Sequence, residues 1–254
     1  RDVERSRGLG DVYKRQVINP PDISRISITG NMGIIYDGTQ TLGLIAGKIL
    51  DNPLNYDNVV LIGGTHKTLP APSCGLIMTN NMYYAEKLKN NITPNYLRNT
   101  QPNHIAALLL SLIEEEQFGP AYQHHVVKTA NLLGNELEKL NFKLAKLTFN
   151  TYTYTHQLFM LMSKMEAEKY YNTAQKFNIT LNKKHKELFN FDGIRIGTQQ
   201  IARYNWQQEE ISQLAQMLYF LQNAEENSEQ ILKLRALLIS KKIPQFEYED
   251  ISIE

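Results

Sequence analysis

The chain has 254 residues, of which 42% are apolar, so it can bury one large or two smaller hydrophobic cores and is too apolar for an intrinsically disordered protein. Its 27 basic and 26 acidic residues leave a formal charge of +1, which gives no electrostatic argument for a nucleic acid or an anionic membrane as partner. The single cysteine, Cys74, excludes an intrachain disulfide and favours a reducing compartment, which we expect to be the cytoplasm.

The N-terminal residues 1–16, RDVERSRGLGDVYKRQ, carry basic residues but lack the apolar segment of a signal peptide. They are similar to translated adapter sequence, so we expect them to be a non-native tail and the natural chain to extend upstream of Val17. The longest apolar run, Ile105–Ile113, is too short for a membrane span, which needs about 20 residues. We therefore expect no membrane partner.

The first half of the chain carries the pattern of an α/β domain. Apolar runs at Met32–Asp37 and Val59–Gly64 predict two buried strands, with a helix between them over residues 39–50 and a further strand over residues 75–81. Continuous apolar strands separated by a helix are typical of a mostly parallel sheet with helices on both faces. We predict part of a large α/β domain over residues 17–118.

The second half alternates between helical and extended patterns. Two helices are expected over residues 103–119 and 121–142, the first ended by Gly119. Further strands are expected at residues 142–147, 156–162 and 193–198, and further helices at 167–178, 209–222 and 228–242. Short strands mixed with helices predict a smaller α+β domain over residues 119–254.

Two polar residues follow the strands of the first half. Asp37 ends the first strand, and Lys67 lies just beyond the second, in the loop GGTHKT. The carboxyl ends of parallel strands meet at one edge of a sheet, where ligands bind, so the two side chains should converge there. An amine and a carboxylate so placed suit pyridoxal phosphate, which needs a Schiff-base lysine and a carboxylate against its pyridine nitrogen. From the residues alone, a solvated lysine and a turn-forming aspartate remain the simpler interpretations.

The amino-acid sequence of these segments resembles that of one enzyme family. GGTHKTLPAPSCGLIMTN is similar to the lysine loop of serine hydroxymethyltransferase, a pyridoxal-phosphate enzyme of fold type I, the aspartate aminotransferase fold. IIYDGTQTLGLIAG resembles the family's strand-end aspartate and the helix that follows. The segments QPNHIAALLL and GIRIGTQQIAR resemble a long helix and the substrate-carboxylate segment. The resemblance covers roughly Val17 to the C-terminus and implies an N-terminally truncated fragment of such an enzyme.

The resemblance implies a role for each residue around the lysine. Lys67 would bind pyridoxal phosphate covalently, and Asp37 would pair with the pyridine nitrogen. His66 would lie near the cofactor and influence reaction specificity, and Thr65 would help to bind the cofactor. Gln40 stands where the family has histidine; it could hydrogen-bond the cofactor's phenolic oxygen but could not protonate it.

The resemblance also implies an arginine that binds the substrate carboxylate through two hydrogen bonds. The family's arginine falls one place later than Arg203, where this chain has Tyr204. We predict that Arg203 does this, with Arg195 as the alternative and a structural ion pair as the competing role of Arg195. The family's Gly-Gly-Pro before the long helix is replaced by Thr100–Asn103, so a phosphate contact across a dimer is in question.

The function implied is aldol-type cleavage or transfer on a small amino acid, with a folate one-carbon carrier as a second substrate whose use the departures leave open. The resemblance also implies a homodimer in the full-length protein. A transaldolase or aminotransferase of the same fold is the alternative enzyme, and a non-catalytic scaffold that keeps the fold is the alternative of another class. The adjacent His124 and His125 point to different faces of a helix and predict no metal site.

Overall fold

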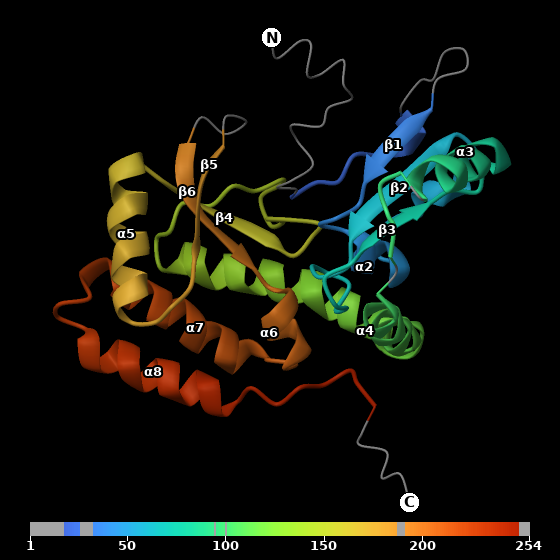
Figure 1. Cartoon of the computed structure of the whole chain (residues 1–254). Helices are drawn as coiled ribbons and strands as arrows, with labels where there is room; N and C mark the ends of the chain where they lie inside the picture. Colours follow the sequence, from blue (N-terminus) through green and yellow to red (C-terminus); the bar gives the residue numbers. More distant parts are fainter. Residues whose placement is uncertain (1–17, 26–32, 94, 100, 187–190, 249–254) are drawn as a thin grey trace, which may run out of the picture. The chain divides into compact units, whose positions relative to one another are not determined.

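The computed structural model describes residues 18–25, 33–93, 95–99, 101–186 and 191–248, so the predicted tail at 1–16 lies outside the described residues. The chain divides into two compact units (Figure 1). Unit 1 contains the described residues up to His124 together with Glu247 and Tyr248, and unit 2 is His125–Phe246. The division falls at His124, whereas the sequence placed a domain boundary near residue 119. No helix among the described residues is both long enough and apolar enough for a membrane span.

Unit 1 is built on a three-stranded sheet in the order β1-β2-β3, formed by β1 (Ile34–Asp37), β2 (Val59–Gly64) and β3 (Gly75–Met78). Strands β1 and β2 are parallel, as predicted, with Asp37 opposite Ile62. Strand β3 is antiparallel to β2, because a short loop returns the chain directly alongside it, whereas a parallel neighbour needs a long crossover.

One face of this sheet is buried and the other is partly open. Alternate residues of β2 are buried, beginning with Val59 and Leu61, and they join a core with residues of β1 and α2 (Leu42–Ala46). On the opposite face Ile35 and Ile77 are about half exposed, at 51% and 48%. The expected cover of helices on both faces is therefore not found at these two side chains.

The helices around the sheet are shorter or more numerous than predicted. The helix expected over residues 39–50 is limited to α2, because Lys48 takes a positive φ of 62° and turns the chain out of the helix. A short 3-10 turn, η3 (Pro53–Asn55), follows. The helix α3 (Met82–Ile92) was not predicted; Asn81 caps it by accepting a hydrogen bond from Tyr84 N.

The two helices expected on either side of Gly119 are one helix, α4 (Pro102–Lys139), so the predicted break is wrong. Pro120 removes a single backbone donor and is exposed, which leaves room for its ring. A buried stripe on the C-terminal half of α4, including Val126, Leu133 and Leu137, offsets the cost of about 3 kcal/mol. The first turns carry exposed apolar side chains, namely Ile105, Leu109, Leu110, Leu112 and Ile113.

Unit 2 contains an antiparallel sheet in the order β4-β6-β5. Its strands are β4 (Gln157–Met162), β5 (Asn182–Lys186) and β6 (Phe191–Gly197), and its further helices are α5 (Lys164–Lys176), α6 (Gln199–Arg203), α7 (Gln208–Phe220) and α8 (Ser228–Ser240), with 3-10 turn η5 (Leu221–Asn223). The first four residues of β4 are buried, and Leu158 and Met160 among them pack into one large apolar core with α4, α5, α7 and α8.

The strand predicted at residues 142–147 is reduced to a single bridge between Leu144 and Met160. The chain bends away immediately afterwards, because Leu147 N donates to Thr151 O at 2.8 Å and closes a tight turn. The other predicted elements of unit 2 are present with bounds shifted by a few residues.

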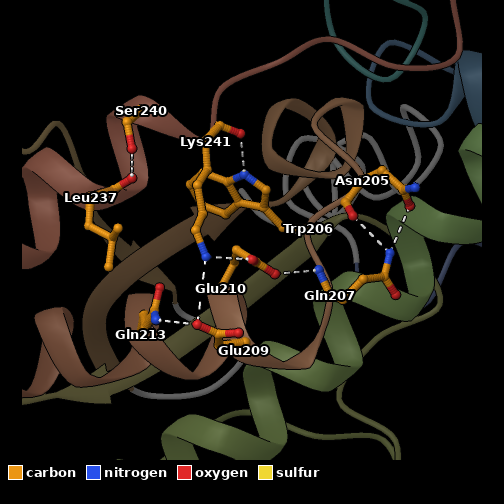
Figure 2. Close-up of polar contacts among 9 residues, drawn as sticks. All are labelled: Asn205, Trp206, Gln207, Glu209, Glu210, Gln213, Leu237, Ser240 and Lys241. Carbon is orange, nitrogen blue, oxygen red and sulfur yellow. Dashed lines mark hydrogen bonds and ion pairs between the residues drawn. The ribbon is translucent and has the colours of Figure 1, made fainter.

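The C-terminal helices of unit 2 are joined by polar contacts around Lys241 (Figure 2). Lys241 Nζ donates to Glu210 Oε1 at 2.8 Å, and the indole of Trp206 donates to Lys241 O at 2.9 Å. The hydrogen bond from Lys241 lowers the pKa of Glu210 below its ordinary value. These contacts fix the end of α8 against the beginning of α7.

Candidate active site

The first part of the candidate site is the turn that follows β1. Asp37 is half-buried, and its Oδ1 accepts a hydrogen bond from Thr39 N at 3.0 Å. Gly38 N donates to Ile62 O of β2 at 2.7 Å, and Thr41 N donates to Gly38 O at 2.8 Å. The aspartate therefore holds the turn that leads from β1 into α2.

The second part is the loop over residues 65–74, which joins β2 to β3 and contains Lys67. Fully buried Thr65 closes its base: Thr65 N donates to Cys74 O, and Cys74 N donates to Thr65 Oγ1, both at 3.0 Å. Thr65 Oγ1 also donates to Pro72 O, and Ala71 N donates to Thr65 O. Thr65 thus has a structural role in shaping the loop, and its role in binding the cofactor stays a prediction.

The turn after β1 and the loop after β2 are hydrogen-bonded to each other. Gly64 N donates to Thr39 Oγ1 at 3.2 Å, at the end of β2. Thr68 Oγ1 donates to the backbone oxygen of Gln40 at 3.3 Å and accepts from Gly43 N at 3.0 Å. The structure therefore brings the segments of Asp37 and Lys67 together at the carboxyl edge of two adjacent parallel strands.

The side chains of this edge differ in their access to solvent. Lys67 is half-buried, whereas His66 is exposed and its Nδ1 lies 3.5 Å from Ser73 Oγ. Cys74 is half-buried beside the base of the loop. A half-buried amine next to an exposed imidazole can reach a ligand that binds over the strand ends.

The two candidate arginines lie in unit 2. Arg195 is on β6, paired with Phe159 of β4 and Asn182 of β5, and burial lowers the pKa of its guanidinium below the ordinary value. No described carboxylate lies within 4.0 Å of Arg195, so the ion pair considered as its competing role is not found among the described residues. Arg203 ends α6 and is half-buried, and its backbone oxygen accepts from Gln245 N.

Sequence reasoning missed two buried polar residues, Thr68 within the lysine loop and Gln123 beside it, both 0% exposed. A signal for Gln123 was present. It stands three residues before Val126 and continues the buried stripe of α4, with steps of 3 and 4 to Val126, Ala130 and Leu133. A polar residue in an apolar stripe needs a partner inside the protein.

Comparisons with known proteins agree with this architecture. A family model described as serine hydroxymethyltransferase matches residues 16–218. The serine hydroxymethyltransferase of Picrophilus torridus is 33% identical over 228 residues, covering 86% of this chain and 52% of the relative. That of Methanocella arvoryzae is 30% identical over 210 residues, covering 79% and 48%. The chain spans about half the length of these curated relatives.

Among solved structures, the fold is similar to a crystal structure of L-threonine transaldolase from Pseudomonas fluorescens. The TM-score is 0.75 over 85% of this chain and 50% of that one, at 22% identity. At this identity the likeness concerns the fold alone, and it confirms the predicted fold class as part of a fold-type-I enzyme.

Proposed function

Because the chain belongs to the serine hydroxymethyltransferase family, we propose that the whole protein uses pyridoxal phosphate for aldol-type cleavage or transfer on a small amino acid. The observation that carries the proposal is the hydrogen-bonded pairing of the Asp37 turn with the Lys67 loop, at the carboxyl edge of parallel strands. Ligands of open α/β sheets bind at such an edge.

The residues at this edge fit pyridoxal phosphate in their chemistry. When bound, the cofactor supplies an electron sink for the bond that breaks in the amino acid. Lys67 offers the amine that holds the cofactor covalently, and its half-buried side chain lies at the loop that follows β2. Asp37 offers a carboxylate that keeps a pyridine nitrogen protonated.

The remaining residues of the site have supporting roles in this proposal. Exposed His66 is free to exchange a proton with substrate groups beside Lys67. Gln40 offers an amide that can hydrogen-bond but cannot move a proton. Arg203 binds the substrate carboxylate with its planar guanidinium; Arg195, which has no described carboxylate within 4.0 Å, is the alternative.

The proposal extends to partners of the whole protein. Its substrates are a small amino acid and, if this branch performs serine–glycine exchange, a folate one-carbon carrier. The working form is a cytoplasmic homodimer. The fold likeness to L-threonine transaldolase favours one second candidate, a transaldolase reaction on a small amino acid, with an aminotransferase of the same fold as the other alternative.

Covalent trapping tests the proposal. The protein is incubated with pyridoxal phosphate, reduced with borohydride and digested, and the labelled lysine is identified by mass spectrometry. We expect the label on Lys67, its loss in Lys67→Arg, and its retention in Lys48→Arg, which changes an exposed lysine of the same unit. A label spread evenly over several lysines, or no label at all, would contradict the proposal and favour a non-catalytic scaffold.

A further inference from the structure

The side chain of Gln123 on α4 holds the backbone next to Lys67. Gln123 is 0% exposed, and its Nε2 donates to Thr68 O at 3.0 Å and to Glu115 Oε1 at 2.9 Å. Thr68 directly follows Lys67 in the chain and is itself 0% exposed. A helix that lies more than 50 residues away in sequence therefore determines where the carbonyl beside the lysine points.

This contact has room only because glycines, which lack a Cβ, stand at positions 43 and 47. A Cβ at Gly43 would lie 2.4 Å from Thr68 O and 2.6 Å from Gln123 Nε2. A Cβ at Gly47 would lie 2.5 Å from Gln123 Cγ. Both glycines belong to α2 or its C-terminal cap, so α2 is packed against the amide of Gln123 as closely as backbone atoms permit.

Both side-chain hydrogen bonds of Gln123 described above are donated by its amide nitrogen. Its Oε1 is buried and accepts no hydrogen bond among the described residues, a cost that a leucine of similar size would avoid. Thr68 is held on its other side too, because its hydroxyl donates to Gln40 O and accepts from Gly43 N. The carbonyl and the hydroxyl of Thr68 are thus both fixed, one by α4 and one by the turn after β1.

We propose that Gln123 is a positioning residue for Lys67: its amide fixes the Thr68 carbonyl and thereby sets the direction in which Lys67 presents its amine at the strand ends. The effect on the Lys67 amine rests on the proposed role of Lys67, but the effect of Gln123 on the loop over residues 65–74 does not. A positioning role predicts that loss of the amide donor loosens the loop over residues 65–74 and makes the reaction of Lys67 less selective, while the sheet beside it stays intact.

Amide hydrogen exchange of the whole 254-residue chain tests whether Gln123 holds the loop over residues 65–74 in place. In Gln123→Leu we expect the amides of Thr65, Ala71 and Cys74 to exchange about tenfold faster, since a buried carbonyl loses its donor. Peptides of β2 should keep their wild-type rates. The matched control is Asn131→Leu, which removes another amide of α4 that binds a loop carbonyl, at Thr153 O in unit 2. It should leave the 65–74 loop unchanged.

A charge-preserving exchange separates positioning from helix stability. The double variant Gln123→Glu with Glu115→Gln restores a donor and an acceptor between positions 115 and 123, but gives Thr68 O no donor. With the carboxylate at position 123 ionised, we expect the loop still to exchange fast although the contact between positions 115 and 123 is kept. Should the loop become protected again in this variant, or should Gln123→Leu accelerate β2 as much as the loop, the positioning role would be wrong.

Borohydride trapping then measures how selectively Lys67 reacts with the cofactor, which depends on the orientation of its amine. We expect the ratio of label on Lys67 to label on exposed Lys48 to fall about tenfold in Gln123→Leu and to be unchanged in Asn131→Leu, because a displaced reacting group loses rate steeply. An unchanged ratio together with a loosened loop would contradict the positioning role. Absence of label on Lys67 in the wild type would contradict the proposed function instead, and the exchange result would still stand by itself.

Discussion

The two sheets of this chain bury their strands to different extents. In unit 2, the first four residues of β4 are buried on both faces, and the core around them draws on four helices. In unit 1, β1 and β3 bury alternate or partial positions, and Ile35 and Ile77 are half exposed. The candidate active-site residues Asp37 and Lys67 belong to the less buried sheet. The proposed site therefore relies on local hydrogen bonds, rather than on a thick core, to hold its geometry.

The largest expected effect is on stability, from a matched pair of core leucines. Leu158→Ala in β4 should lower the free energy of unfolding by about 4 kcal/mol, because a core closed on both faces collapses little around a cavity. Leu61→Ala in β2 should cost about 2 kcal/mol, since Leu61 belongs to the smaller core, whose side chains can relax further into a cavity. Urea unfolding with peptide-resolved hydrogen exchange measures both. Equal costs in the two units would contradict the difference between the sheets.

Asp37→Asn tests whether a residue of the less buried sheet contributes to turnover rather than to stability. In the whole protein we expect turnover to fall about a hundredfold, or about 2.7 kcal/mol of barrier, because the cofactor nitrogen loses its charged partner. The unfolding midpoint should change little, since asparagine keeps the oxygen that accepts from Thr39 N. Steady-state kinetics beside thermal unfolding checks this, and an unchanged turnover would place Asp37 outside the site.

The two arginines of unit 2 allow a test of where that unit contributes to binding. Arg203→Lys should raise the KM for the amino acid strongly and leave the spectrum of the bound cofactor unchanged, because lysine lacks the planar fork that grips a carboxylate. Arg195→Lys, on the central strand β6, should mainly lower the melting temperature. If Arg195→Lys instead raises KM and Arg203→Lys does nothing, the carboxylate site is built on β6.

The smallest expected effect is a pH dependence at the end of α8. The pKa of Glu210 is lowered mainly by its hydrogen bond from Lys241, so the stability that Glu210 contributes is present above its unfolded pKa and is lost as the pH falls through the lowered folded pKa. In Lys241→Gln the folded pKa of Glu210 should rise toward its ordinary value. Carboxyl NMR titration measures this pKa. An unmoved pKa would mean that the backbone amides of Gln207 and Glu210 stabilise the carboxylate without Lys241.

Local patterns predicted β1, β2 and β4 because each of these apolar runs is continuous, and the roles of the lysine and aspartate beside the strand ends stay predictions. The antiparallel direction of β3 was not predicted, although the loop over residues 65–74 is too short for the crossover that a parallel neighbour needs. The break predicted at Gly119 failed because Pro120 faces solvent and the buried stripe beyond it continues the helix. Gln123 was overlooked because its partner, Thr68, is 55 residues away in sequence.

The backbone of Cys74 is bonded in both directions to Thr65, at the base of the loop that carries Lys67. The sequence contains no second cysteine. A thiol reagent therefore attaches to one defined place, and because Cys74 is half-buried, its rate of alkylation should follow how often the base of this loop opens. The alkylation rate of Cys74, measured with a chromogenic thiol reagent in a spectrophotometer, therefore reports on the opening of the loop on which the proposed chemistry depends.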